Sequence, residues 1–421
     1  MFSYLSQGLK NGLRVVFVPT DSPSLAVKLL IGAGSRHDSP KLAGTAHFLE
    51  HVSAFSETVK NPKPMALVKK LDSIGAIHNA GTTREYSEYW VKSAVKDLDL
   101  ALEAISQSVF HSLIGSRRIE TERGAILEEY NMYQDSPSER IGDLFSQVMF
   151  GNSSLGWEMT GNRDQIKKIG RDDLLAFRQA FYQPENMILA IAGGIKKDQW
   201  PELVKTIEKY FTNLPAWKAG VKKTDFCLGK SRSLLEPRTT EQLHLIFGLP
   251  IFGINDQRRW PMLLLNAVLG GNSSSRLFAK IREDRGWAYY IGSFTNYYQE
   301  TGMFAVMAGL RKDKAGLALG LIKNELLKVG KTLTQLEFKK AKSFLEGRYL
   351  LSLESPLGMA SSIGQSWLSE GKIRTVEETQ KRIKEISFDQ VRDLAQSLFF
   401  KDAFYLSAIG PKESLSLLKN D

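Results

Sequence analysis

The feature that most constrains the fold of this chain is an internal repeat. Residues 169–194 (IGRDDLLAFRQAFYQPENMILAIAGG) align without gaps with residues 386–411 (ISFDQVRDLAQSLFFKDAFYLSAIGP). Both segments have the pattern of a short Ile-x-x-Asp start, an amphipathic helix, a polar turn, an apolar strand and a glycine. The offset is constant, since 386 − 169 = 217 and 410 − 193 = 217, and it also brings the apolar segment near Ala26 close to the one near Leu243. The sequence therefore predicts a duplicated domain.

The repeat sets the domain boundaries. A Lys-, Gly- and Ser-rich stretch without periodicity separates the two halves, so we predict an N-terminal half at 1–217, a linker at 218–233 and a C-terminal half at 234–421. Within the first half, residues 11–19 form a strand pattern after an Asn-Gly turn signal, and residues 95–110 form an amphipathic helix pattern. The predicted fold class is α+β, with two homologous halves that each hold a mixed β-sheet with helices packed on one face.

Composition excludes several other classes of protein. The 421 residues include no apolar run of the roughly 18 residues that a membrane span needs. The N-terminal segment has no basic region followed by an apolar one, which leads us to expect a cytoplasmic location. The net charge of +10 is spread along the chain among Asp and Glu, so a nucleic-acid partner is not expected. The single cysteine, Cys227, excludes a Cys-rich zinc site, and any metal must be held by His and carboxylates.

Residues 47–51 (HFLEH) carry the chemistry of the chain. On a helix, His47 and His51 are one turn apart, so both imidazoles project from the same face and can reach one ion. Glu50 shares that face and can reach a water molecule on the ion, while Phe48 and Leu49 point toward the core. This H-x-x-E-H order is the inverse of the thermolysin-type motif and indicates a zinc peptidase with Glu50 as general base.

A catalytic zinc needs a third protein ligand and one open position. The helical segment 119–137 (IETERGAILEEYNMYQDSP) offers four candidates, which are Glu120, Glu122, Glu128 and Glu129. Glu122 and Glu129 are two helical turns apart and share a face, whereas Glu128 is turned about 100° away from Glu129. We therefore predict Glu129 as the third ligand and Glu122 as a catalytic group that orients a ligand or the substrate. A solvated helix charge is the alternative for Glu122.

These motifs in combination resemble the M16 (pitrilysin-like) family of zinc metallopeptidases, over nearly the whole chain. HFLEH followed by ERGAILEEYNMYQDSP carries the resemblance, together with SLAVKLLIGAGSRHDSPKLAGTAHFLEH, IHNAGTTREYSEYWVKS and GGNSSSRLFAKIREDRGWAYYIGS. In this family the third ligand is the second Glu of the LEE triplet, which matches Glu129. The resemblance also implies a two-half clamshell whose second half lacks zinc, and His244 is the only histidine after residue 111.

The resemblance also implies how substrate and partners are bound. A chain of this length is similar to the shorter branch, typified by mitochondrial processing peptidase, in which two chains enclose a chamber. A peptide is expected to add as a strand along Asn79, Ala80, Gly81 and Thr82, where Gly81 replaces the family's aromatic residue. In the second-half signature, Arg282 and Tyr289 match the residues that contact substrate. Their alternative is ordinary packing at a helix end and in a strand.

The predicted function is therefore that of a zinc-dependent endopeptidase with one Zn²⁺ per chain, acting on peptides or unfolded polypeptides inside a chamber. A homodimer is expected because both the zinc motif and the Arg-Tyr signature occur in one chain. Two alternatives stay open. The chain can be one subunit of a heterodimeric processing peptidase with a zinc-less paralogue, or a non-catalytic peptide-binding protein of the same fold.

Overall fold

The computed structural model describes residues 3–214 and 226–418, which form two compact units. Unit 1 comprises residues 1–131, 157–225 and 351–377, and unit 2 comprises residues 132–156, 226–350 and 378–421. Of the predicted linker 218–233, residues 218–225 lie outside the described residues, and Ser233 begins the first strand of unit 2. None of the helices in the described ranges combines the length and the apolar composition of a membrane span.

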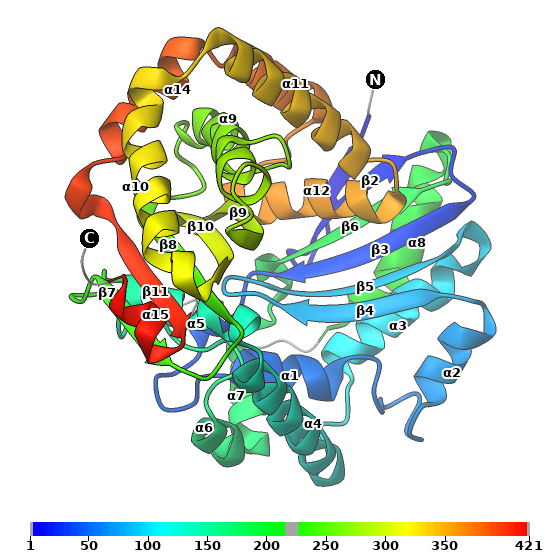
Figure 1. The fold of residues 1–421 in the computed structure, drawn as a ribbon. Coiled ribbons are helices and arrows are strands. Elements are labelled where there is room, and N and C mark those ends of the chain that lie inside the picture. Colours follow the sequence, from blue (N-terminus) through cyan, green and yellow to red (C-terminus); the bar gives the residue numbers. More distant parts are fainter. Residues whose placement is uncertain (1–2, 215–225, 419–421) are drawn as a thin grey trace. The chain divides into compact units, whose positions relative to one another are not determined.

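Unit 1 is built on a six-stranded sheet in the order β1-β2-β6-β3-β5-β4 (Figure 1). All neighbouring pairs are antiparallel except β2 and β6, so the sheet is mixed, as predicted. β4 is an edge strand with β5 as its one neighbour. The strands are β1 (Leu5–Gly8), β2 (Arg14–Pro19), β3 (Ser24–Ile31), β4 (Ile77–Thr82), β5 (Ser87–Ala94) and β6 (Met187–Gly193).

Both faces of this sheet are buried by apolar layers. Side chains alternate along each strand, so neighbouring residues of one strand enter different layers. Along β2, Val15 and Phe17 face a large core that α1, α3, α7 and α8 help to form, while Val16 and Val18 face a second apolar layer. The helices of unit 1 are α1 (Thr45–Ser53), α2 (Ala66–Ser73), α3 (Leu98–Phe110), α4 (Ser116–Asp135), α6 (Arg163–Lys168), α7 (Arg171–Phe181), α8 (Trp200–Phe211) and α12 (Pro356–Glu370).

Unit 2 holds a five-stranded mixed sheet in the order β7-β11-β8-β10-β9, in which β7 and β11 are parallel. Its strands are β7 (Ser233–Pro237), β8 (Gln242–Phe252), β9 (Ala288–Tyr297), β10 (Thr301–Arg311) and β11 (Tyr405–Gly410). Its helices are α5 (Pro137–Phe150), α9 (Arg259–Leu269), α10 (Ala315–Thr332), α11 (Gln335–Ser352), α13 (Val376–Glu385), α14 (Phe388–Leu398) and α15 (Lys412–Ser416). Of the five points at which the chain passes between the units, three lie within helices, namely α4, α11 and α13.

The two sheets confirm the predicted duplication. The order β2-β6-β3-β5-β4 in unit 1 corresponds strand for strand to β7-β11-β8-β10-β9 in unit 2. The helix and strand that revealed the repeat are α7 and β6 in the first half and α14 and β11 in the second, and 388 − 171 = 217 for the two helix starts. The α+β class with two homologous mixed sheets is therefore established.

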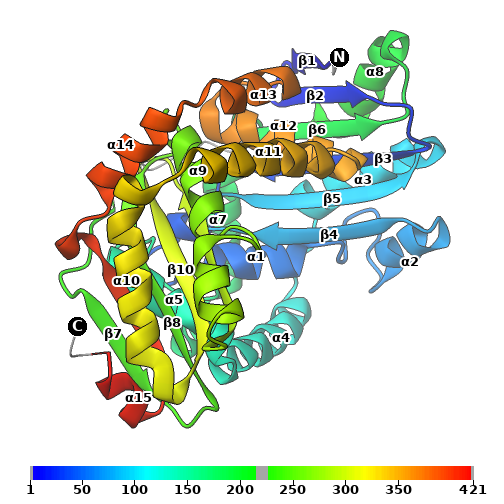
Figure 2. The ribbon, with the colours of Figure 1, turned by 45° about the horizontal axis from the view of Figure 1, so that its top comes forward.

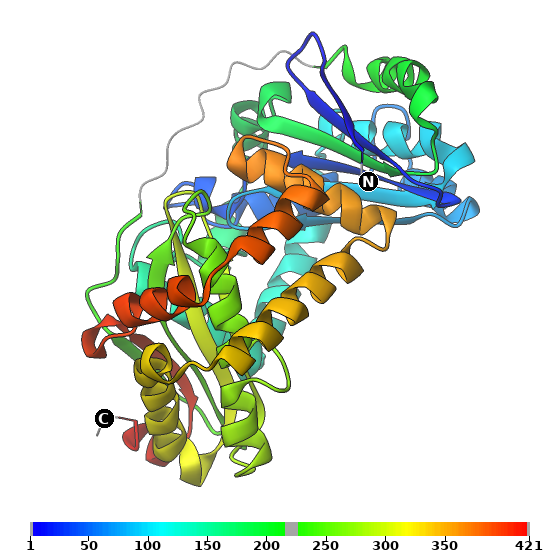
Figure 3. The same ribbon diagram turned by 90° about the horizontal axis from the view of Figure 1, so that it is seen from above.

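The structure adds one feature that the sequence analysis did not predict, which is an exchange of helices between the halves. α5 comes from the first half of the chain but packs on β8 and β11 of unit 2, and α12 comes from the second half but packs on β3 and β6 of unit 1. Figures 2 and 3 show α12, in orange, lying across the strands of unit 1. The compact units are therefore not the contiguous segments 1–217 and 234–421, because each sheet takes the helix on its second face from the other half.

The exchanged helices are themselves members of the repeat. Each begins with a Ser-Pro pair, Ser136-Pro137 in α5 and Ser355-Pro356 in α12, in which the serine is the N-cap residue and the proline occupies the first turn. Their starts are 219 residues apart, since 356 − 137 = 219. Both sheets are thus covered by equivalent helices on a second face, in addition to the one face on which the sequence analysis predicted helices.

Candidate metal centre

Helix α1 is held in place at its N-terminus by Asp38, a residue that the sequence analysis did not single out. One carboxylate oxygen of the buried Asp38 accepts the N–H of Gly44 at 2.7 Å, and the other accepts the N–H of Ala46 at 2.9 Å. Gly44 has φ +97°, and a Cβ at this position would collide with the carbonyl oxygen of Thr160. The start of α1 is therefore fixed three residues before His47.

The apolar residues of α1 fix its rotation. Phe48 and Leu49 are fully buried in the core of unit 1, as predicted, and Val52 joins them. With this face turned inward, His47 and His51 lie side by side, with ring centroids 4.5 Å apart and an angle of 71° between the ring planes. His47 is buried and His51 is partly exposed. The helix therefore presents two imidazoles next to each other, one of which is open to solvent.

Helix α4 brings Glu129 to both imidazoles. Its Oε2 lies 3.6 Å from Nε2 of His47 and 3.4 Å from Nε2 of His51. A tetrahedral zinc with bonds of about 2.0–2.1 Å would hold its ligand atoms roughly 3.3–3.5 Å from one another. The distance from Glu129 to His51 lies within this range and the distance to His47 exceeds it by about 0.1 Å, and two nitrogens and one carboxylate oxygen are the donor types that zinc binds. These three residues fit a zinc ion with one position left open.

Glu122, also on α4, contacts the other nitrogen of His51. Its Oε2 lies 3.1 Å from Nδ1 of His51, and its Oε1 lies 2.9 Å from Nη2 of Arg118, a residue that the sequence analysis missed. A carboxylate at Nδ1 fixes the imidazole so that Nε2 presents its lone pair to an ion. Glu122 therefore has the position that the helical spacing predicts for an orienting group.

His47 is held differently. Its Nδ1 is buried and has no hydrogen-bond partner among the described residues. Its ring is 6% exposed, so packing rather than a hydrogen bond sets its orientation. The two imidazoles therefore differ in their surroundings, because a carboxylate contacts Nδ1 of His51 and no polar group of the described residues hydrogen-bonds to Nδ1 of His47.

Glu50 lies beside this centre without pairing with either imidazole as closely as Glu129 does. Glu50, His47 and His51 each offer one ligand atom within 4.8 Å of the others, so Glu50 is geometrically a second candidate for the third ligand. Among the described contacts, Glu129 forms close ion pairs with both rings, whereas the carboxylate of Glu50 lies 3.4 Å from the hydroxyl of Thr82. These contacts favour Glu129 as the ligand and Glu50 as a group next to the open position.

Burial and charge shift the pKa values of all three groups on α1. Burial and the neighbouring charge of His51 lower the pKa of His47 to about 4. Burial also disfavours a charge on His51, but the contacts with Glu122 and Glu129 outweigh it and raise the pKa of His51 to about 9. Burial raises the pKa of Glu50 to about 7, helped by the charge of Glu129 and opposed by His51 and Thr82. In the absence of a metal, the proton on His51 compensates the carboxylates that surround it.

The predicted peptide-binding segment is the edge strand β4, which lies next to α1 (Figure 1). The Thr82 hydroxyl contacts Glu50, so the C-terminal end of β4 lies at the metal centre. Farther along the strand, the N–H of Ala80 donates to Oδ1 of Asn79 at 2.9 Å, and Gly81 pairs with Glu88 of β5. An unpaired strand edge is a template for an added strand. The structure thus brings Thr82, but not a partner strand, to the centre.

Arg282 and Tyr289 belong to unit 2, and both side chains are exposed. Arg282 lies in a short π-helical segment (Phe278–Glu283), with its guanidinium 4.7 Å from the centroid of the Phe278 ring. Tyr289 lies in β9 and is 74% exposed. Neither side chain is used in the core of unit 2, which leaves both free for contacts outside it.

Among its described residues, unit 2 has no counterpart of the candidate metal centre. At the offset of 217, the positions of His47, Glu50 and His51 correspond to three buried residues of α9, Leu264, Ala267 and Val268. The one histidine of unit 2, His244, lies 2.9 Å from the Tyr290 hydroxyl through its Nδ1. The apolar substitutions on α9 explain how the second half keeps the fold without the site.

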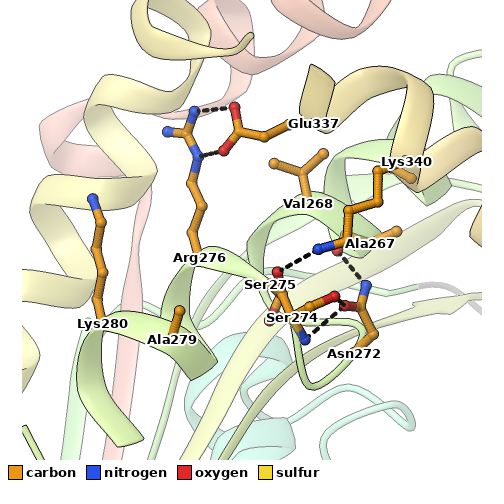
Figure 4. A pocket seen from close by; sticks show the side chains of 11 residues that line it. Ala267, Val268, Asn272, Ser274, Ser275, Arg276, Ala279, Lys280, Glu337 and Lys340 are labelled. Carbon is orange, nitrogen blue, oxygen red and sulfur yellow. Dashed lines mark hydrogen bonds and ion pairs between the residues drawn. The ribbon is translucent and has the colours of Figure 1, made fainter. Parts of the chain in front are cut away.

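A pocket in unit 2 is lined by polar side chains that are already paired (Figure 4). Arg276 donates to both oxygens of Glu337, at 2.6 and 2.8 Å, and to the backbone and hydroxyl oxygens of Thr332. Lys280 pairs with Glu325 at 2.5 Å, and Lys340 donates to the carbonyl of Ser274 at 3.1 Å. The guanidinium has its donors occupied, so this network serves to tie α11 to the segment after α9.

Comparison with known proteins gives two family matches. Residues 14–163 match the family model described as "Insulinase (Peptidase family M16)", and residues 168–345 match the one described as "Peptidase M16 inactive domain". The first match contains every residue of the candidate metal centre. The second covers most of unit 2, in which the counterpart of α1 carries no metal-binding side chain.

Curated relatives match along nearly the whole chain. A Bacillus subtilis protein named "Uncharacterized zinc protease YmxG" is 31% identical over 410 residues, which cover 96% of this chain and 98% of that protein. An uncharacterized zinc protease of Streptomyces coelicolor is 34% identical over 415 residues, covering 96% and 88%. Among solved structures, a protease from Helicobacter pylori has a TM-score of 0.89 at 22% identity, covering 98% of this chain and 100% of that one. A Pseudomonas fluorescens structure described as a peptidase M16 inactive domain has a TM-score of 0.87 at 19% identity, covering 97% and 98%. The two structures show that the fold is shared.

Proposed function

Since this chain belongs to peptidase family M16, we propose that it is a zinc-dependent endopeptidase whose centre is formed by His47, His51 and Glu129. The observation that carries the proposal is the approach of one Glu129 oxygen to within 3.6 Å of both imidazole Nε2 atoms. A carboxylate that formed only a salt bridge would need one imidazole partner, whereas this oxygen has two. The relatives named zinc proteases support the same metal and reaction class.

The chemistry divides between the metal and the residues of α1 and α4. When bound, zinc supplies Lewis acidity toward water and toward the peptide carbonyl. Glu50 accepts a proton from the attacking water and passes it to the nitrogen of the leaving amine. Burial raises the pKa of Glu50 to about 7 in the metal-free protein, and the charge of a bound cation would lower it, which favours the carboxylate form that accepts the proton. Glu122 keeps the His51 ring in the orientation that directs Nε2 to the metal.

The edge strand β4 is the proposed binding site for the peptide. A substrate strand that adds beside Asn79, Ala80, Gly81 and Thr82 gains main-chain hydrogen bonds with little demand on its sequence. The contact between Thr82 and Glu50 supports this placement, because a strand along β4 then passes the general base. Arg282 and Tyr289 of unit 2 are proposed to contact the substrate as well. We propose a homodimer as the active assembly, and a heterodimer with a zinc-less paralogue is the alternative.

The decisive experiment measures cleavage of a quenched-fluorescent peptide by the purified chain together with its zinc content. We expect activity that a chelator abolishes and added zinc restores. Glu50→Gln should keep one zinc per chain and lose turnover by a factor of about 10² or more, because the proton acceptor is removed and no ligand is.

A matched pair of variants tests the ligand assignment. Glu129→Gln should lose zinc, whereas Glu128→Gln, which changes the exposed neighbouring residue on the same helix, should keep both zinc and activity. Zinc bound to the wild type at one per chain without cleavage of any peptide would refute the peptidase proposal and favour a peptide-binding protein or a subunit that needs a partner.

A further inference from the structure

Arg118 makes two contacts that converge on the ligand His51. Arg118 lies in the first turn of α4 with a side chain that is 29% exposed. Its Nη2 is 2.9 Å from Oε1 of Glu122 and 3.3 Å from the carbonyl oxygen of His51. The other carboxylate oxygen of Glu122 lies 3.1 Å from Nδ1 of His51. One guanidinium therefore contacts both the backbone of His51 and the carboxylate that holds its ring.

The backbone contact completes the C-terminus of α1. The last four carbonyls of a helix have no partner inside the helix. Here the Glu50 carbonyl accepts the N–H of Ala54 at 2.8 Å, and the Val52 carbonyl accepts the hydroxyl of Ser56 at 2.7 Å. The His51 carbonyl accepts Arg118. A cation at this end of a helix is also favoured by the helix dipole, so Arg118 stabilises the turn of α1 that carries His51.

We propose that Arg118 is a positioning residue of the metal centre, which fixes His51 at two points through its own carbonyl and through Glu122. A ring that is tied at the backbone and at Nδ1 has little freedom to turn its Nε2 away from Glu129 and His47. This inference rests on the proposed function for the identity of the metal, and its main readout is metal binding rather than activity.

An electrostatic role and a positioning role of Arg118 predict opposite changes in zinc affinity when the residue is replaced. A guanidinium repels a divalent cation, so a purely electrostatic role predicts that zinc binds more tightly once Arg118 is neutralised. A positioning role predicts weaker binding, because Glu122 loses the partner of its second oxygen and the His51 carbonyl loses its donor. The sign of the change in zinc affinity therefore separates the two roles.

The test compares Arg118→Met with Arg117→Met. Arg117 is the preceding residue on α4, carries the same charge and is exposed, so it controls for long-range electrostatics. Zinc dissociation constants are measured by competition with a chromogenic chelator, and the unfolding midpoint of the metal-free protein checks folding. We expect R118M to bind zinc about 10–100-fold more weakly, as is found when groups that support a metal ligand are lost. R117M should change affinity by less than about two-fold, because its exposed charge is screened.

Two further variants keep the proposal open to refutation if R118M does not fold. R118K retains the charge on a shorter side chain with one nitrogen, so it should bind zinc with an affinity between those of the wild type and R118M. Combined with Glu122→Gln, R118M should add less than its single effect, because both changes release the same ring. Unchanged or tighter zinc binding by R118M or R118K, or strictly additive effects, would overturn the proposal. A wild type that binds zinc but cleaves no peptide would refute the proposed function and leave this result standing.

Discussion

Gly364 tests whether close packing of the exchanged helix α12 stabilises unit 1. A Cβ on Gly364 would lie 2.5 Å from Cδ1 of Leu30 and 3.0 Å from Cβ of Ala190. Leu30 and Ala190 are fully buried, on β3 and β6, so neither can move without repacking the layer between α12 and the sheet. The cost of inserting a methyl group into such a layer is about 1–3 kcal/mol.

The matched control is Gly124 in α4, which is exposed, belongs to the same unit and has nothing within 4 Å of an added Cβ. Alanine in place of glycine stabilises a helix interior by roughly 0.5–1 kcal/mol at either position. Gly124→Ala should therefore raise the free energy of unfolding by that amount. Gly364→Ala gains the same helix propensity but loses packing, so the two variants should differ by about 1–3 kcal/mol.

The assay is urea unfolding followed by far-UV circular dichroism, with a chelator present so that zinc binding does not contribute to the midpoint. We expect the midpoint of Gly124→Ala to rise and that of Gly364→Ala to fall. Equal shifts in the same direction would show that α12 is not closely packed on β3 and β6, and the reasoning on the exchange would fail.

Three further predictions follow from other contacts. Asp38→Ala should lower the free energy of unfolding by about 1–3 kcal/mol and weaken zinc binding, because two N–H groups at the start of α1, which carries His47 and His51, lose a buried acceptor; unchanged stability in thermal unfolding would contradict this role. Arg276 and the Thr334 backbone lower the pKa of Glu337 from 4.5 to about 2 despite partial burial, so its stabilising contribution is complete above pH 4.5 and is lost as the pH falls toward 2. The loss should amount to about 1–2 kcal/mol at this partly exposed side chain, and Glu337→Gln should show a correspondingly flatter acid unfolding curve. Residues 1–217 and 218–421 expressed separately should each aggregate, because each lacks the helix that covers one sheet face, and they should form a soluble complex when co-expressed; a soluble, folded 1–217 by circular dichroism and gel filtration would argue against the exchange.

Local periodicity was enough to predict which side chains of the candidate metal centre share a face within each helix. His47, Glu50 and His51 share a helical face because of their spacing, and the choice of Glu129 over Glu128 needed only the 100° rotation per residue. The same argument placed Glu122 on the helical face of Glu129, two turns before it, and in the structure a carboxylate oxygen of Glu122 lies 3.1 Å from Nδ1 of His51. These are relations within one helix, which the sequence encodes directly.

The groups that hold the centre in place could not be found in the same way. Asp38 is in a loop before α1, and Arg118 reaches the His51 carbonyl across 67 residues of chain. An Arg-Glu pair at i,i+4, such as Arg118 and Glu122, was the one local signal, but this spacing is common on solvated helices. Which of many such pairs meets a ligand depends on where two helices pack.

By itself, the sequence determined the duplication, the α+β class and the residue types that can hold a metal, because each of these is written as a repeat or a short-range period. The strand order that the two sheets share came from the structure. Only the tertiary structure decided that α5 and α12 change places and that β4 ends beside Glu50. Both halves carry equivalent helices with an apolar face that start with Ser-Pro, so hydrophobic patterning alone does not show on which of the two sheets each helix packs. The choice of sheet depends on how the elements are connected and on how individual side chains fit, as Gly364 does against Leu30. Both are properties of the assembled chain.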